Sequence, residues 1–170
     1  SKDAELESVN LMLKSLEIAG IKNITLSLGH AAFTSSVLEP FKKLGREIFA
    51  DIEIALSKKS KSDLDTIIPD SYENKQSLIS LCDMYGDIDI IQSAKESFSY
   101  LEATQNFMED LEGLADKLIH KSGLILHVDL GEVQGFKYHN GVVFSAYADS
   151  AGYVLAKGGR YDGLRKQSDR

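Results

Sequence analysis

Apolar residues recur at the three- and four-residue spacing of amphipathic helices through about the first two-thirds of the chain. The clearest segment carries Phe107, Leu111, Leu114 and Leu118 on one face. Glycine and proline mark several helix ends, as Gly20 does after the first segment. The pattern predicts helices over residues 3–19, 30–38, 41–57, 62–68, 71–85, 87–97 and 101–120.

Other segments show the alternation or the short apolar runs of β-strands, namely 24–28, 124–130, 141–147 and 153–156. A short connection between the last two favours an antiparallel hairpin. Helices followed by antiparallel strands predict an α+β fold, in which an antiparallel sheet is flanked by helices. We interpret residues 1–170 as a fragment of one domain, with a mainly helical part at 1–122 and a strand part at 123–170, because so few strands leave an exposed sheet edge.

Composition narrows the classes of protein that fit. A net charge of −7 argues against a general nucleic-acid surface, which needs clustered Lys and Arg. The main basic run, residues 57–61, we interpret as a solvated loop before a helix. The sequence shows neither a secretory signal nor the roughly 18 consecutive apolar residues of a membrane-spanning helix. Cys82 lies on an apolar helical stripe, which predicts a core position, and a lone cysteine fits a cytoplasmic location.

The strongest local motif is Gly-Gly-Arg-Tyr-Asp-Gly at residues 158–163, after a predicted strand. Gly158 and Gly159 would let the backbone approach a ligand closely or adopt a positive φ. Arg160 could present its planar fork to a carboxylate or phosphate, and Asp162 could bind an amine. The alternative is an ordinary turn in which Arg160 and Asp162 pair with each other. The residues support both interpretations equally.

A second motif fills the connection between two predicted strands, residues 129–141. It combines glycines, an aromatic pair and several polar groups, which is typical of a pocket rim. The alternative interpretation is a long hairpin loop in which Tyr138 packs over the sheet.

Together the two motifs resemble the class II histidyl-tRNA synthetase family. Members of that family carry Arg-Gly-Leu-Asp-Tyr-Tyr-Thr-Gly, then a strand, then Ala-Gly-Gly-Arg-Tyr-Asp-Gly-Leu. Here residues 134–141 read QGFKYHNG and residues 157–164 read KGGRYDGL. The resemblance implies a partial class II synthetase-like domain. It also implies a remnant histidine pocket lined by Gln134, Tyr138, His139, Gly158, Gly159, Arg160, Tyr161 and Asp162.

The departures from the family pattern concern the chemistry of the site. In synthetases the first arginine of the motif stabilises charge while the amino acid attacks ATP, and its position here is Gln134. An amide cannot match a guanidinium beside a developing phosphate charge. Lys137 replaces the aspartate and His139 the second tyrosine. We therefore expect no aminoacylation, and we assign no catalytic residue, cofactor or metal.

Residues 138–147, YHNGVVFSAY, are similar to Tyr-His-Thr-Gly-(hydrophobic)-Val-Phe-Ala-Ala-Tyr in a second branch, the regulatory subunits of short-form ATP phosphoribosyltransferase. Ala4-Glu5 at the head of a helix and residues 26–30 agree with that branch. The resemblance implies a non-catalytic regulatory subunit that assembles with the short catalytic subunit for the first step of histidine biosynthesis, under feedback control by histidine. It further implies a homodimer within a hetero-oligomer, without nucleic-acid or membrane partners.

Two alternatives stay open. A working histidyl-tRNA synthetase of unusual sequence would be accompanied by an anticodon-binding domain in the complete gene. A synthetase-like scaffold with a different partner would be favoured by a genome that lacks the short-form phosphoribosyltransferase.

Two further hypotheses concern His30 and the pair His127 and Asp129. His30 follows a glycine and is expected to be a helix-entry residue rather than a ligand. His127 and Asp129 alternate on one strand face and could bind a metal, but two ligands on one strand are too few for a site.

Overall fold

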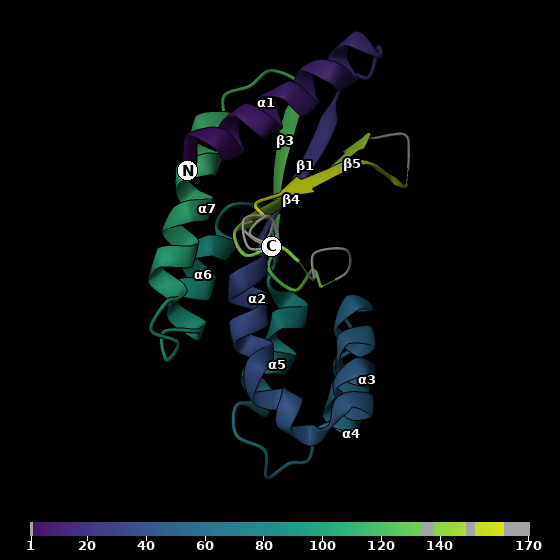
Figure 1. Ribbon diagram of the computed structural model, residues 1–170, viewed down its shortest axis with the longest axis vertical. Coiled ribbons are helices and arrows are strands. Elements are labelled where there is room, and N and C mark those ends of the chain that lie inside the picture. Colours follow the sequence, from purple (N-terminus) through teal and green to yellow (C-terminus); the bar gives the residue numbers. More distant parts are fainter. Residues whose placement is uncertain (1, 134–137, 149–151, 162–170) are drawn as a thin grey trace, which may run out of the picture.

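The computed structural model describes residues 2–133, 138–148 and 152–161. Within them the strands form one sheet in the order β2-β3-β1-β4-β5 (Figure 1). Their bounds are Ile24–His30 (β1), Tyr85–Gly86 (β2), Leu124–Asp129 (β3), Val142–Ala148 (β4) and Val154–Gly159 (β5). Neighbours pair antiparallel except β1 and β3, which are parallel, so the sheet is mixed rather than antiparallel throughout. A parallel pair needs a long crossover, and here the crossover holds most of the helices.

Long helices cover one face of the sheet. α1 (Lys2–Ile18) contacts β5, and α7 (Thr104–Leu118) contacts β1 and β3, with α6 (Ile90–Ser97) packed on α7 (Figure 1). Because side chains alternate along a strand, Leu26 and Leu28 of β1 point into this helical layer and are fully buried. The amphipathic face predicted for α7 is confirmed, since Leu111, Leu114 and Leu118 are buried.

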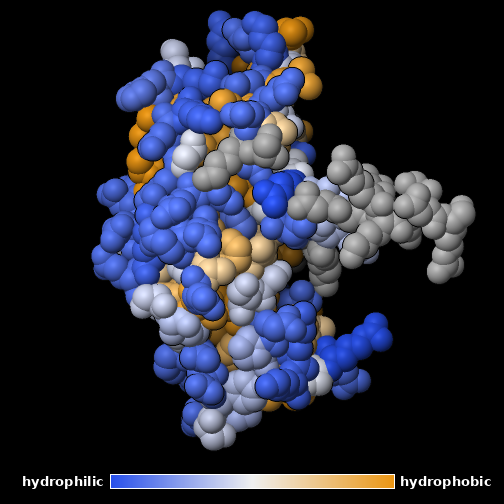
Figure 2. Space-filling view, turned by 60° about the vertical axis from the view of Figure 1, so that its left-hand side comes forward, coloured by the Kyte–Doolittle hydropathy of each residue, from blue (hydrophilic) through white to orange (hydrophobic). Residues whose placement is uncertain are grey.

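The remaining helices form a helical lobe, residues 31–83, at one end of the sheet (Figure 1). Its elements are α2 (Ala31–Leu38), η1 (Glu39–Leu44), α3 (Arg46–Ser57), α4 (Lys61–Ile67), α5 (Lys75–Ser80) and η2 (Leu81–Asp83). Seen from the α7 side, the surface is mostly hydrophilic, and apolar residues show in the middle, where the lobe meets the rest of the molecule (Figure 2). The lobe and the sheet share one continuous apolar core.

The structure corrects some predicted helix bounds. The helix predicted over 41–57 is divided at Gly45, whose φ of 101° interrupts the helical conformation, so that a 3-10 helix precedes α3. The helix predicted over 71–85 is α-helical only within Lys75–Ser80, and Asn74 before it has a left-handed φ of 64°. Tyr85, placed by helical spacing on a buried stripe, instead pairs with β3 and is half exposed.

Several other predictions are confirmed. The short connection does join an antiparallel hairpin, β4 and β5. Cys82 is buried in the core, and burial raises the pKa of its thiol. One position is corrected, since Gly158 and Gly159, predicted to follow a strand, are the last residues of β5 itself.

Candidate functional site

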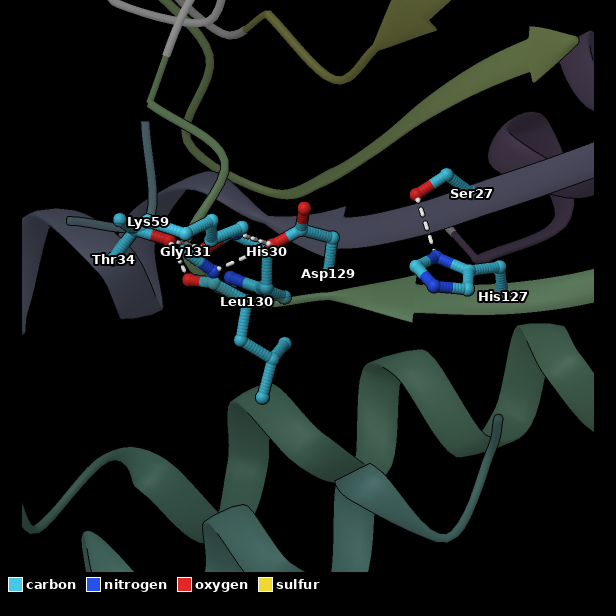
Figure 3. Close-up of polar contacts among 8 residues, drawn as sticks. All are labelled: Ser27, His30, Thr34, Lys59, His127, Asp129, Leu130 and Gly131. Atoms are coloured by element: carbon cyan, nitrogen blue, oxygen red, sulfur yellow. Dashed lines mark hydrogen bonds and ion pairs between the residues drawn. The ribbon is translucent and has the colours of Figure 1, made fainter. Parts of the chain in front are cut away.

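The face of the sheet opposite α1 and α7 carries a row of polar side chains. His127, Ser27, Ser145 and Lys157 stand in register across β3, β1, β4 and β5, and we call them the polar row. Ser27 Oγ lies 3.4 Å from His127 Nδ1 (Figure 3). The row places two hydroxyl groups, of which that of Ser145 is buried, between an imidazole and an ammonium group on the face that the helices do not cover, and such groups can bind a polar small molecule.

A small hollow of about 30 Å³ lies beside this row, lined among others by Gly29, Asp129, Glu132 and Tyr147. Burial raises the pKa of the Tyr147 hydroxyl, and the Glu132 charge raises it further. Tyr147 therefore remains a neutral hydrogen-bonding group at this carboxylate-bordered hollow.

The paired glycines of β5 lie against aromatic rings from β4 and from the segment just before it. A Cβ at Gly158 would lie 2.5 Å from the Phe144 ring, and one at Gly159 would lie 2.7 Å from the His139 ring. Neither glycine is among the described residues with positive φ, so of the two alternatives predicted for the pair, positive φ is not the one observed. The close approach is real, but its partners are side chains of the protein's own hairpin.

Arg160 turns toward the helical side of the sheet. Its Nη1 lies 3.7 Å from Oε1 of Glu5, a buried residue of α1. Its backbone extends the hairpin ladder, since Arg160 N–H donates to Val142 O and Asn140 N–H donates to Arg160 O. Arg160 also borders a groove of about 680 Å³ between α1 and β5. Asp162, the alternative partner predicted for Arg160, lies outside the described residues.

Three aromatic side chains of the two motifs meet. Tyr161 lies with its ring centroid 6.5 Å from that of Tyr138 and 6.4 Å from that of His139, both in edge geometry. Tyr138 is 79% exposed, so it packs against Tyr161 and does not lie down over the sheet. Gln134 lies outside the described residues.

The residues named from the sequence therefore divide between two sides. His139 and Gly159 belong to the open face with Tyr138 and Tyr161, whereas Gly158 and Arg160 face the helical layer. Charge and aromatic groups of the motif do not converge on one point within the described residues.

His30 is confirmed as a helix-entry residue. Its Nδ1 accepts a hydrogen bond from Phe33 N–H at the start of α2, and its Nε2 lies 3.8 Å from Asp110 Oδ2. Burial lowers the pKa of His30 to about 4, although the Asp110 charge opposes the shift. The imidazole is therefore neutral near pH 7.

His127 and Asp129 have partners other than a metal. Asp129 binds Lys59 and His127 contacts Ser27. No group of three or more potential metal ligands occurs in the part of the chain that the structure describes. Nor does any helix there have the length and apolar character to cross a membrane.

Lysines of the basic run, predicted to lie in a solvated loop, bind carboxylates. Lys59 binds Asp129 of β3 and lies 5.4 Å from the centroid of the Tyr85 ring, while Lys61 binds Asp83. Lys59 is only 27% exposed, so it is not a solvated loop residue. No local pattern marks it, because its partner is distant in the sequence.

A family model described as histidyl-tRNA synthetase matches residues 1–170. The chain belongs to the histidyl-tRNA synthetase family. Curated relatives are ATP phosphoribosyltransferase regulatory subunits. That of Hydrogenovibrio crunogenus is 31% identical over 169 residues, which are 95% of this chain and 43% of the relative. That of Ralstonia pickettii is 32% identical over 161 residues, 94% of this chain and 41% of the relative. The chain thus spans less than half the length of these relatives, and the predicted resemblance to regulatory subunits is confirmed.

Solved structures agree on the fold. An ATP phosphoribosyltransferase regulatory subunit/histidyl-tRNA synthetase from Bacillus halodurans C matches with a TM-score of 0.77 and 25% identity over 96% of this chain and 44% of that one. An ATP phosphoribosyl transferase (HisG:HisZ) complex from Thermotoga maritima matches with a TM-score of 0.69 and 18% identity over 95% and 57%. The synthetase-like fold predicted from the motifs is confirmed.

Proposed function

We propose that the protein to which these residues belong is a non-catalytic regulatory subunit of ATP phosphoribosyltransferase. It acts with a short catalytic subunit in the first step of histidine biosynthesis, and histidine controls the complex. In this proposal residues 1–170 are part of one synthetase-like catalytic-type domain. The protein forms a homodimer within a hetero-oligomer in the cytoplasm.

The observation that carries the proposal is the set of curated relatives. ATP phosphoribosyltransferase regulatory subunits are 30–32% identical over 94–99% of the chain. The complex from Thermotoga maritima supports the same role, since a chain of this fold occurs in an ATP phosphoribosyl transferase assembly.

The residues at the synthetase motif support the absence of aminoacylation. Gln134 stands where a synthetase has arginine, and His139 stands where it has a tyrosine. Without the guanidinium, developing negative charge on a phosphate has no fixed counter-charge from that position.

The open face of the sheet supports a histidine site. Tyr138, His139 and Tyr161 form an aromatic edge above Gly159, and the polar row lies alongside. An imidazole ring can pack on aromatic edges, while its amino and carboxylate groups need polar partners. We propose that this cluster faces the ligand and that Gln134 and Asp162, its neighbours in the two motifs, belong to the same site. Arg160, through its contact with Glu5, would fix the end of β5 against α1.

The deciding experiment combines the full-length protein with the short-form catalytic subunit of the same organism. Phosphoribosyl-ATP formation is measured with and without each protein and over a range of histidine concentrations. We expect formation to require both proteins and to fall with histidine. Formation that is indifferent to this protein would overturn the assignment.

A matched pair of variants locates the ligand site. Tyr161→Ala removes the shared member of the aromatic cluster, whereas Tyr153→Ala removes a tyrosine that is 68% exposed and lies just before β5. We expect the first to weaken histidine inhibition and the second to leave it unchanged. Equal inhibition in both variants would place histidine elsewhere.

A second candidate function is histidyl-tRNA synthesis, which the family model over residues 1–170 favours. Histidine-dependent exchange of pyrophosphate into ATP by the full-length protein alone distinguishes the two. We expect no exchange, and exchange above background would make the protein a synthetase.

A further inference from the structure

The end of β3 is a junction between the sheet and the helical lobe. Leu130 N–H donates to Met84 O at 2.9 Å, and Thr34 Oγ1 of α2 donates to Leu130 O at 2.8 Å. Next along the chain, Gly131 N–H donates back to Asp129 Oδ1 at 3.0 Å. In Figure 3 Asp129, Leu130, Gly131, Lys59 and Thr34 gather at this point. Helix α2 of the lobe and Met84, the residue that follows the lobe, therefore hold a single turn.

Lys59 completes the junction from the turn between α3 and α4. Its backbone has a left-handed φ of 54°, and its Nζ donates to Asp129 Oδ1 at 2.5 Å. A Cβ at Gly131 would lie 3.0 Å from this Nζ and 2.9 Å from Leu81 O. The backbone contact with Leu81 O requires glycine at this position, and the Lys59 ammonium packs directly against it.

One carboxylate oxygen thus receives two donors that come from different regions. Asp129 Oδ1 binds the ammonium of the helical lobe and the backbone N–H of the turn at Gly131. Both side chains of the ion pair are less than a third exposed, which limits screening by solvent. Any movement of Lys59 with the lobe therefore acts on the carboxylate that holds this turn.

The turn leads directly into the connection that carries the candidate ligand residues. Glu132, which lines the hollow on the open face, follows the turn. His139, which lies against Gly159, is near the other end of the connection. We propose that Lys59 is a positioning residue that acts through Asp129, so that the placement of the helical lobe and the geometry of the His139 end of the site change together. The regulatory consequence, but not the coupling itself, rests on the function proposed above.

Amide hydrogen exchange of the full-length protein without ligand tests the coupling. Lys59→Met removes the charge, and Asp129→Asn removes its partner while keeping an oxygen for Gly131 N–H. We expect amides at residues 131–133 and 138–141 to exchange roughly tenfold faster in both variants, as expected for loss of a hydrogen bond to a charged group. The double variant should match Asp129→Asn alone, because Lys59 acts through that carboxylate.

Lys61→Met is the matched control. Lys61 lies two residues away and pairs with Asp83, but both side chains are more than half exposed and both residues belong to the lobe. We expect its exchange to change only near residues 61 and 83. Amides of α7 report global unfolding, so their exchange measures the loss of overall stability in each variant, and the changes at residues 131–133 and 138–141 are judged relative to them.

The coupling would be overturned by faster exchange confined to residues 57–61, or by equal effects of Lys59→Met and Lys61→Met at residues 131–141. Addition of the two single effects in the double variant would also contradict it. In the assembled complex, the histidine concentration for half inhibition should shift severalfold for Lys59→Met and not for Lys61→Met. A wild-type complex without any histidine response would instead defeat the proposed function, while the exchange data would still decide the coupling.

Discussion

The β4–β5 hairpin and the helical lobe depend on different kinds of contact. In the hairpin, the backbone of Gly158 and Gly159 lies directly against the rings of Phe144 and His139. The lobe is attached by packed apolar side chains, a few backbone hydrogen bonds and the Lys59–Asp129 pair.

This difference explains why only one of the two regions carries a conspicuous motif. Where the backbone lies against an aromatic ring, only glycine fits, so the constraint produces a recognisable pair of consecutive glycines. An apolar core accepts many side chains of suitable size, and an ion pair needs only one residue at each end. The lobe can therefore influence the site without a recognisable pattern.

The largest expected effect tests whether the lobe is integral to the fold. Phe33 of α2 is fully buried, with its ring in edge contact with Phe98 at 5.2 Å. Phe33→Ala should lower the free energy of unfolding by about 3–5 kcal/mol, because it leaves a cavity between the lobe and the helical layer. Urea denaturation measures the change, with Leu11→Ala, at a residue that is 69% exposed, as the control. Similar losses in both variants would contradict the described packing.

The next largest effect is the pH dependence of stability due to His30, which lies where β1 meets the lobe. The pKa of His30 is lowered from 6.5 to about 4, so the unfolded chain binds a proton that the folded protein does not. The stability that depends on neutral His30 is fully present above pH 6.5. As the pH falls toward 4, the free energy of unfolding decreases by roughly 3 kcal/mol in all.

His30→Asn keeps a helix-capping side chain but cannot titrate. We expect the wild type to lose more stability than this variant between pH 7 and pH 4.5 in parallel denaturation curves. Identical pH dependence in the two proteins would show that His30 is protonated as readily in the folded state as in the unfolded state.

A smaller effect tests the steric origin of the hairpin motif. Gly158→Ala places a methyl group 2.5 Å from the Phe144 ring and should destabilise the protein by about 1–3 kcal/mol. Gly152→Ala is the control, because a Cβ there meets no atom within 4 Å. Adding Phe144→Leu should restore part of the stability lost by Gly158→Ala. Without such recovery, the glycine would be required for another reason.

The smallest effect compares the two lysines of the lobe. Lys59→Met should lower the free energy of unfolding by about 1–2 kcal/mol, since Asp129 loses a charged donor in a partly buried setting. Lys61→Met should leave thermal denaturation unchanged, because its pair with Asp83 is solvent-exposed. A larger loss for Lys61→Met would reverse the ranking of the two contacts.

Local patterns predicted the elements with strong periodicity well. The spacing of Leu111, Leu114 and Leu118 located α7, and the alternation after Asn23 located β1. Prediction failed where a distant partner decided the conformation. Tyr85 fits a helical stripe, yet pairing with Asp129 places it in β2. Of the candidate site, the residue types and the family were predictable, whereas the division of Arg160 from His139 across the sheet was not.

The sequence by itself determined the class of fold, the family and the inward faces of the main helices, because periodicity and the Gly-Gly-Arg-Tyr-Asp-Gly motif depend on neighbours along the chain. Only the tertiary structure decided the parallel pairing of β1 with β3, the ion pair of Arg160 with Glu5 and the link between Lys59 and Asp129. These contacts join residues that are far apart in the chain. Their free energy depends on burial and on distances that no local pattern specifies.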